Sequence, residues 1–404
     1  MPSFKIFSNA VGFFVIVLFT ACGGTWELAH VTVREPQGLE RKKEYVEVFF
    51  PITEAPSIPA QICMIYGADE GHVPVQFRQM PDNPELIHAV FPVTLPPQGI
   101  RHISLLACKD TTHQVSGSLM IRGEEPGFVL ENPFFVADLG TSTDIPTRNY
   151  PPGHLTSLLL KEFDNLRLQR SGMKIHWSPN FAKDSLSYKT MADLDADSFD
   201  IFRGGYMVRM KKSGTIPGYE EIFLQGEYTF YDSLPYFLFS SDMEIQQTTA
   251  LYLLRNDEMT VDSMFTHLAF RRKNGEIEHL ALYESATFSH LDTFPLEADA
   301  PWLYFYHAEK GFAIGSVRID YDNTAADGTG SPLYKAHTKI TPSAQNGRYW
   351  NRRLIHDQTT EIPEGSRYRE KNAYIVFRFS EKSGDILMDN LYERLTYPLR
   401  LEVK

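Results

Sequence analysis

The residue types best suited to chemistry lie in four short clusters in the second half of the chain. Each cluster places aromatic side chains beside charged or polar ones, and the four are His176-Trp177, Arg255-Asn-Asp-Glu258 with Thr266-His267, Trp302-Leu-Tyr-Phe-Tyr-His307, and Tyr349-Trp-Asn-Arg-Arg353 followed by Glu370-Lys-Asn-Ala-Tyr374. Aromatic faces stack on sugar rings, and an arginine can hold a carboxylate through two parallel hydrogen bonds. The clusters therefore predict a site for a carbohydrate that carries carboxylate groups.

A lyase that cleaves such a glycan by β-elimination needs three kinds of side chain. One neutralises the uronate carboxylate, a base removes the neighbouring proton, and an acid protonates the leaving oxygen. The candidates for these roles are, in that order, Arg255 or Arg352 with Asn256 or Asn372, then His267 or His307, and then Tyr304 or Tyr374. A glycoside hydrolase would instead need two carboxylates, for which Glu258 and Glu370 form the available pair.

The other candidates would hold the sugar rather than react with it. Alternation along a strand sends every second side chain to the same face, which places Trp350 with Arg352, and Glu370 with Asn372 and Tyr374. The expected substrate-binding residues are His176, Trp177, Asn256, Trp350, Arg352 and Asn372, and the expected concave aromatic face is built from Trp177, Tyr304, Trp350 and Tyr374. For each cluster, ordinary core packing, turn chemistry or surface ion pairing remains an alternative.

Charge and missing motifs exclude several classes of protein. Aspartate and glutamate outnumber lysine and arginine by 51 to 39, which argues against nucleic acid as a partner and means that an anionic glycan would need local arginines. The sequence has no P-loop, no HExxH, no GxSxG, no CxxC pair and no dinucleotide-binding glycine fingerprint. The histidines lack ligand-like spacing, so we expect no metal and no cofactor.

The elements that must position these clusters are predicted to be strands. Short alternating segments separated by Pro, Gly, Asp and Asn fill both halves of the chain, and only 155–160 and 387–395 look helical. A break near 124–127 divides the halves. The pattern predicts an all-β chain with a small N-terminal β-barrel at 31–125, followed by a large antiparallel β-supersandwich at 131–404.

The N-terminal residues form a pattern that directs export. Lys5 is followed by an apolar run at 11–19 that is short for a membrane span, and small residues then lead to Cys22. This order resembles the lipobox of bacterial lipoproteins, which implies that residues 1–21 are a signal peptide and that Cys22 is lipidated. Residues 22–30 would then be a tether, and the protein would be a membrane-anchored lipoprotein of the bacterial cell envelope.

Two further cysteines, Cys63 and Cys108, lie in apolar segments of the first half. An exported compartment permits a disulfide between them, and two buried thiols are the alternative.

Several stretches together resemble the exo-rhamnogalacturonan-lyase-like proteins. They are Arg34-Glu-Pro-Gln-Gly-Leu-Glu-Arg41 with 44–48, 58–60 and 73–77 in the first half, and 204–209 and 228–236 in the second. The resemblance implies a RIFT-type barrel followed by a galactose-mutarotase-like β-supersandwich, in a carbohydrate context. In that group a separate helical domain usually follows and holds the active site, and we expect this chain to lack it.

Three functions follow from these observations. The first is an exported lipoprotein that acts on or binds a uronate-containing, pectin-like polysaccharide in a glycan-degradation system, by β-elimination if it is a polysaccharide lyase. The alternative is a non-catalytic glycan-binding lipoprotein, and a second alternative is a mutarotase-like sugar epimerase. The arrangement of the candidate side chains discriminates between a lyase and a binding protein. A lyase needs Arg, His and Tyr around one substrate position, whereas a binding protein does not.

Overall fold

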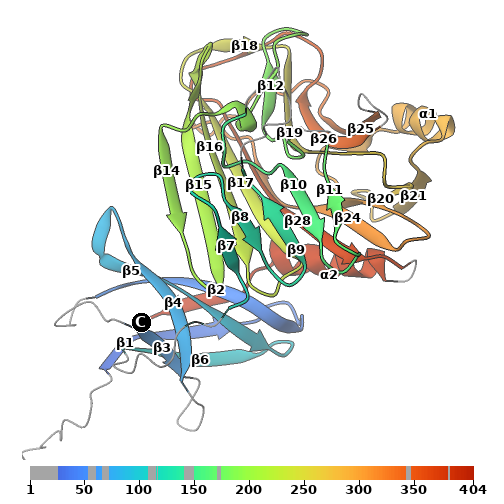
Figure 1. The fold of residues 1–404 in the computed structure, drawn as a ribbon. Helices are drawn as coiled ribbons and strands as arrows, with labels where there is room; N and C mark the ends of the chain where they lie inside the picture. The colour runs from blue at the N-terminus through green and yellow to red at the C-terminus, as the bar shows by residue number, and fades with distance from the viewer. Residues whose placement is uncertain are drawn as a thin grey trace, which may run out of the picture.

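The chain is almost entirely β-structure. The computed structural model describes residues 26–52, 61–65, 72–107, 115, 117–140, 150–170, 174–342, 347–380 and 383–404. In these ranges the α-helices are α1 (Ser285–Thr293) and α2 (Gly384–Thr396), and neither is long and apolar enough to cross a membrane. The predicted all-β architecture, a small barrel followed by a large supersandwich, is confirmed (Figure 1). The predicted signal peptide, Cys22 and Cys108 lie outside the described residues.

The N-terminal sheet curls into a nearly closed barrel. Its seven strands run in the order β2-β5-β4-β3-β6-β1-β29, and β2 and β29, at its two ends, lie close together. Alternate residues of each strand point inward and are buried, as Val46, Val48 and Phe50 are. The strands are β1 (Trp26–Arg34), β2 (Arg41–Pro51), β3 (Ile62–Ile65), β4 (Val73–Met80), β5 (Asn83–Leu95), β6 (Ile100–Ala107) and β29 (Arg400–Val403).

Both ends of the described chain meet in this sheet. Strand β1 begins at Trp26, inside the segment predicted as a tether, because it pairs with β6 along its whole length. Strand β29, expected to belong to the supersandwich, pairs with the other edge of β1, so that Val31 lies opposite Val403. The last strand therefore completes the first domain.

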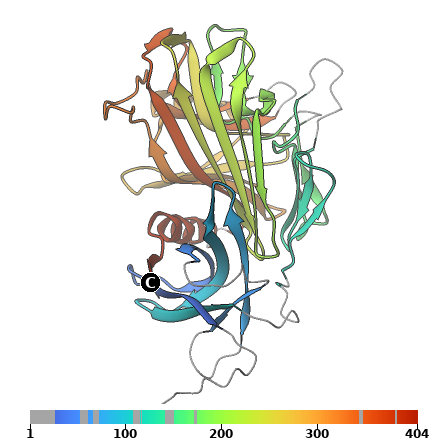
Figure 2. The ribbon, with the colours of Figure 1, turned by 90° about the vertical axis from the view of Figure 1, so that its left-hand side faces the viewer.

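One layer of the supersandwich is a nine-stranded antiparallel sheet. Its outer face packs against the barrel and α2, and Figure 2 shows α2 between the two. In spatial order its strands are β14 (Ser198–Phe202), β15 (Met207–Ile216), β16 (Tyr219–Tyr231), β17 (Tyr236–Ile245), β28 (Arg367–Arg378), β24 (Phe312–Asp322), β23 (Trp302–Tyr306), β20 (His267–Arg271) and β21 (Ile277–Ala281).

Two smaller sheets cover the inner face of this layer. The five-stranded sheet consists of β11 (Leu166–Leu168), β10 (Ser157–Leu160), β9 (Phe135–Asp138), β8 (Val129–Glu131) and β7 (Met120–Arg122). The six-stranded sheet consists of β13 (Lys189–Thr190), β12 (Asn180–Ala182), β19 (Leu253–Val261), β26 (Arg348–Ile355), β25 (His337–Pro342) and β22 (Leu296–Glu297). A two-stranded ribbon of β18 (Thr249–Leu251) and β27 (Thr360–Ile362) completes the strands described.

The two helical predictions had different outcomes. The segment 387–395 lies within α2, as expected. The segment predicted as a helix at 155–160 contains strand β10 instead, because its leucines pair across to β9 and Leu158 and Leu160 are buried there. A short run of leucines suits either structure, and the neighbouring strand decides between them.

The interior of the supersandwich has two apolar parts. One surrounds Trp350 and Tyr374, and the other surrounds Phe181 and Tyr368. Charged and polar side chains lie where these two parts meet, and we call them the polar layer. Tyr321 is partly buried, and the other members are buried: Ser178, Ser241, Asn256, Asp257, Ser316, Arg318, Arg352, Glu370 and Asn372.

Candidate functional site

The polar layer is centred on Asp257, which is fully buried. Its Oδ1 accepts hydrogen bonds from Ser316 Oγ at 2.8 Å, Trp350 Nε1 at 3.1 Å and Tyr374 OH at 3.2 Å. Its Oδ2 accepts one from Arg318 Nε at 2.8 Å. Four donors, one of them charged, satisfy the hydrogen-bonding capacity of this buried carboxylate.

Glu370 is the second carboxylate of the layer and is 2% exposed. Its Oε2 accepts from the backbone N–H of Asp257 at 2.8 Å and from Asn372 Nδ2 at 2.7 Å. Its Oε1 accepts from Ser241 Oγ at 2.9 Å and from Ser178 Oγ. Burial raises the pKa of Glu370, and the hydrogen bond from Ser178 acts against that rise.

Two guanidinium groups balance these two acids. Arg318 pairs with Asp257, and Arg352 lies 4.0 Å over the ring of Tyr321. Arg352 also donates to Asn256 Oδ1 at 3.2 Å and to the carbonyl of Ala298 at 2.7 Å. The layer is therefore charge-balanced within itself, as a structural network requires.

A β-bulge in β19 explains how Asp257 enters the interior. Asn256 lies opposite Arg352 and Met259 opposite Trp350, so two residues of β19 face a single residue of β26. Asp257 has a φ of 46°, a left-handed conformation that Asp tolerates better than most residues. Asp257 reaches the carboxylate network inside the supersandwich, and the next residue, Glu258, hydrogen-bonds to Asn180 instead.

His176 belongs to the same interior. Its Nε2 lies 3.0 Å from Tyr374 OH, and its Nδ1 is hydrogen-bonded to Tyr228 OH. Burial lowers the pKa of His176 to about 3, so its imidazole is neutral. It orders two tyrosine hydroxyls inside the core.

Most of the predicted site residues thus come together, but inside the protein. The residues in or against the polar layer are His176, Asn256, Trp350, Arg352, Glu370, Asn372 and Tyr374. Trp350 and Tyr374 are fully buried, so they cannot stack on a sugar. The expected concave aromatic face is wrong in this respect, because alternation shows which side chains share a face and not whether that face is open.

The remaining predicted catalytic residues lie elsewhere. Tyr304 is buried on the opposite face of the nine-stranded sheet and donates to Asp385 of α2 at 2.7 Å. The His267 ring stacks on Tyr306 at 5.1 Å. His307 Nδ1 accepts from the backbone N–H of Lys310 at 3.2 Å. In the described residues no hydrogen bond links any of the three to Arg255 or Arg352, so the predicted lyase combination is not assembled.

Arg255 lies on the other face of the six-stranded sheet. It is paired with Asn180 on one side and with Arg353 on the other, and Arg353 is paired with His337. Residues opposite one another in neighbouring strands share a face. Because Asn256 and Arg352 point into the polar layer, the side chains of this row across β12, β19, β26 and β25 point away from it. We call this row, with Glu258 and Asn351, the outer polar face; Asn351 is fully buried, and Asn180, Arg255, Glu258 and Arg353 each retain a small exposed fraction.

The outer polar face is rich in unused hydrogen-bonding capacity. Arg255 is only 8% exposed, yet its guanidinium makes no hydrogen bond or ion pair in the described part of the chain and lies 5.6 Å from the centre of the Tyr188 ring. Asn180 Oδ1 and Asn351 Nδ2 are also buried without a partner. Buried polar groups are nearly always paired, so these three groups have capacity left for a ligand.

Glu258 adds a carboxylate to this face. It is 5% exposed and accepts one hydrogen bond, from Asn180 Nδ2 at 3.1 Å. Burial raises the pKa of Glu258, and the nearby charge of Arg255 acts against that rise. Trp177, another predicted site residue, donates its backbone N–H to the carbonyl of Glu258 at 3.1 Å and packs its ring edge-on against Tyr150.

Among the described residues, Arg353, unlike Arg255, has hydrogen-bond partners for its guanidinium. Its Nε donates to Asn351 Oδ1 at 3.1 Å, and its Nη1 is hydrogen-bonded to His356 Nδ1. Burial and the charge of Arg353 lower the pKa of His356 to about 4, so this imidazole is neutral and accepts from the guanidinium. The row therefore combines one fixed arginine, Arg353, with one unpaired arginine, Arg255.

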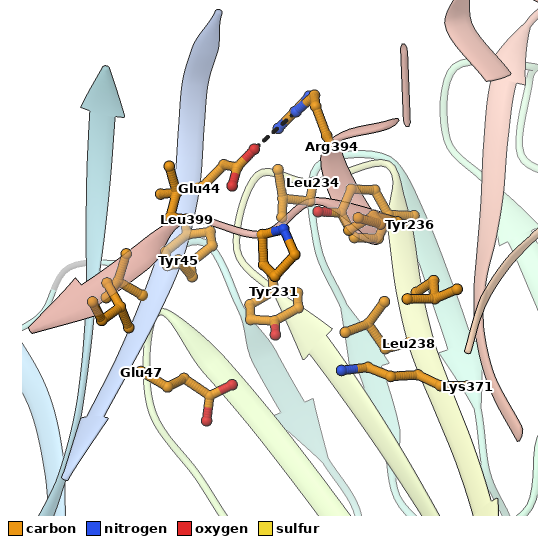
Figure 3. A pocket seen from close by; sticks show the side chains of 15 residues that line it. Glu44, Tyr45, Glu47, Tyr231, Leu234, Tyr236, Leu238, Lys371, Arg394 and Leu399 are labelled. Carbon is orange, nitrogen blue, oxygen red and sulfur yellow. Dashed lines mark hydrogen bonds and ion pairs between the residues drawn. The ribbon is translucent and has the colours of Figure 1, made fainter. Parts of the chain in front are cut away.

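A separate cavity of about 260 Å³ lies where the barrel meets the supersandwich (Figure 3). Tyr45 of β2 stacks on Tyr231 of β16 there, with 5.3 Å between the ring centres. The two acids that line it are already paired: Glu44 with Arg394, and Glu47 with His88 and Arg209. We therefore attribute to this cavity a part in joining the domains, and regard the outer polar face as the candidate functional site.

Sequence reasoning singled out Arg255, Asn256 and Glu258 but not the partners of Arg255. Asn180 and Arg353 are brought to Arg255 by strand pairing between segments far apart in the chain. Turn chemistry is the alternative interpretation of the Asn256-Asp257 dipeptide, and the structure has a β-bulge there. This bulge sends Asp257 and Glu258 to different faces of β19. In the sequence, the Asn256-Asp257 dipeptide is the only signal of the bulge.

Comparison with known proteins identifies the fold. No family model matches the sequence, and no curated protein matches it. Two solved structures from Enterococcus faecalis, a protein in the glycosyl hydrolase family 38 and an alpha-mannosidase, match with TM-scores of 0.53 and 0.54 at 10% and 11% identity. Each match covers 93% of this chain, but only 47% and 46% of those chains. A galactose mutarotase-like protein from Lactobacillus casei matches 64% of this chain with a TM-score of 0.36. The chain thus shares the barrel and supersandwich architecture of the first two proteins and spans about half of their length.

Proposed function

We propose that this protein binds an acidic polysaccharide on the outer polar face. The observation that carries the proposal is Arg255, a buried guanidinium with no hydrogen bond or ion pair in the described chain. Leaving such a cation unpaired is costly, and the carboxylate of a uronate would pair with it bidentately. Asn180 and Asn351 offer one free acceptor and one free donor for sugar hydroxyls.

The carbohydrate class is supported by the two solved structures with the same architecture. They are a glycosyl hydrolase family 38 protein and an alpha-mannosidase, so this fold occurs in proteins that act on sugars. The acidic character of the ligand rests on Arg255 and Arg353, which neighbour each other on the face. Because the whole chain has an excess of acids, these local arginines must supply the attraction.

Binding is a better account of the site than hydrolysis or β-elimination. Glu258 and Glu370, the pair expected for a hydrolase, lie on opposite faces of β19, since Glu370 bonds to the inward-facing Asp257 and Glu258 to Asn180. The strand between them prevents both from reaching one glycosidic bond. His267 and His307, the expected bases of a lyase, make no described contact with Arg255. We therefore prefer a non-catalytic glycan-binding protein within a degradation system.

Substitution of Arg255 tests this proposal. Replacing Arg255 with Met should weaken binding of oligogalacturonates by about 1.5–3 kcal/mol, the contribution of a charge-assisted hydrogen bond, which is a tenfold to hundredfold higher Kd. Titration calorimetry at two salt concentrations measures this, and the difference should shrink at high salt. Arg122→Met, at a largely exposed arginine of β7, is the control and should bind as the wild type does.

Thermal unfolding of the same variant separates a ligand site from a structural role. Without ligand, Arg255→Met should not lower the unfolding midpoint, because it removes an unpaired buried cation. If the midpoint falls clearly, Arg255 has a structural role. Equal binding of neutral and uronate oligosaccharides, unchanged in Arg255→Met, would exclude an acidic ligand at this face.

We further propose that the protein is exported and anchored to the bacterial envelope through Cys22, which the order of Lys5, the apolar run and the cysteine supports. Cys22→Ala should abolish lipid labelling and release the protein from the membrane fraction. Cys63→Ala, at a buried cysteine of β3, is the matched control and should stay with the membrane. Retention of unlabelled Cys22→Ala protein in the membrane would refute the anchor.

A further inference from the structure

We infer that the binding surface continues from Arg255 into a cavity beside α1, so that the ligand is a chain of several sugars lying across the strands. The cavity has a volume of about 660 Å³ and is bounded by α1, β25 and His356. The inference rests on the proposed function and deepens it, because it defines the length and direction of the glycan.

The floor of the cavity and the outer polar face belong to one face of the six-stranded sheet. His337, Lys339 and Thr341 line the cavity and alternate along β25, so their side chains share a face. His337 lies opposite Arg353, and Lys339 opposite Asn351, the two β26 residues of the outer polar face. The row that begins at Asn180 and passes Arg255 therefore ends in the cavity.

The cavity offers the contacts that a sugar ring uses. Phe288, Leu291 and Pro295 form an apolar wall on the side of α1. Opposite them, the hydroxyl of Thr341 is buried without a hydrogen-bond partner. His337 adds an imidazole whose pKa is lowered by burial, so it is neutral near pH 7 and can bond to sugar hydroxyls.

The dimensions favour an oligosaccharide over a single sugar. From β12 to β25 the row crosses three strand spacings, which amounts to about 14 Å. This length exceeds one sugar ring. The arginines lie on β19 and β26, the two middle strands of the row, and the apolar wall lies beyond its β25 end. A glycan chain would therefore place a carboxylate at Arg255 and rest a more distant ring against α1.

Ligand length and a blocked cavity test this inference together. Oligogalacturonates of one to six units are titrated into the wild type, Ala336→Trp and Thr341→Val. Ala336 is a half-buried residue that lines the cavity, and its replacement by Trp fills the space without removing a polar group. Wild-type affinity should rise at least tenfold from the shortest to the longest ligand. In Ala336→Trp that gain should disappear while the affinity for the shortest ligand stays unchanged.

The other outcomes are equally informative. Thr341→Val keeps the shape of the side chain and should reduce only the gain in affinity with ligand length. It keeps the inference testable if Ala336→Trp misfolds, which thermal unfolding would reveal. A gain with length that persists in both variants, or no gain in the wild type, would overturn the extension into the cavity. Failure of every ligand to bind, or binding insensitive to Arg255→Met, would refute the proposed function itself.

Discussion

Replacing Asp257 with Asn should lower the free energy of unfolding by about 3–5 kcal/mol, the cost of breaking a buried ion pair from one side. Asn can adopt the left-handed backbone of residue 257, and it keeps a side-chain carbonyl for Ser316 and Trp350. The loss would therefore come mainly from the charge. Arg318, buried against this carboxylate, would be left without its counterion.

Denaturant unfolding measures this loss, and two further variants interpret it. Asp322→Asn removes a partly exposed carboxylate paired with Arg369, and its effect should be much smaller. The double variant Asp257→Asn with Arg318→Met should recover part of the stability, because the uncompensated cation is gone. A loss below about 1 kcal/mol in Asp257→Asn would show that the pair is not the centre of the polar layer, since even an ordinary hydrogen bond contributes that much.

Replacing Lys212 with Met should have the opposite effect and stabilise the protein near neutral pH. Lys212 is 2% exposed, and its Nζ has only the carbonyl of Leu194, at 3.4 Å, as a described partner. Burial lowers the pKa of Lys212 from 10.5 to about 7, and the charge of Lys174 adds to this. Holding the ammonium form in the folded state costs a few kcal/mol, and Met fills the space without a charge.

The pH dependence of the unfolding free energy shows whether the buried charge of Lys212 causes this stabilisation. Between pH 7 and 10.5 the unfolded chain binds more protons at Lys212 than the folded protein does, so stability should rise with pH across that window. In Lys212→Met this contribution to the slope should vanish, and the gain over the wild type should shrink as pH increases. Lys211→Met, one residue earlier and on the opposite face of β15, is the control. An unchanged slope in Lys212→Met would refute the assignment.

The sequence allowed the architecture to be predicted because alternation is local. Apolar side chains at every second position define strands such as β2 and β17, whose inward residues are buried in that pattern. Segments with little alternation were harder to assign. The leucines of β10 were wrongly predicted to form a helix. Helix α1, in which Thr287 is the one buried residue, was not predicted.

The site was predicted less well, because its formation depends on strand order. Alternation correctly placed Trp350 with Arg352, and Glu370 with Tyr374, but could not show that a second sheet encloses them. Arg255 was predicted beside Asn256, although the two side chains lie on opposite faces of β19. Its neighbours Asn180 and Arg353 come from distant segments, and only the register between strands reveals them.

The pairing of β29 with β1 has a consequence for how this protein is made. The barrel begins with residues synthesised early, yet one of its edges is covered by Arg400–Val403. Arg41, fully buried in the barrel, likewise donates to the carbonyls of Arg394 at 2.9 Å and Tyr397 at 2.6 Å. The barrel, whose other strands all precede the supersandwich in the chain, thus cannot be completed before the supersandwich has been synthesised. Contacts of such high sequence separation make folding slow, so the barrel should be the slower of the two domains to form.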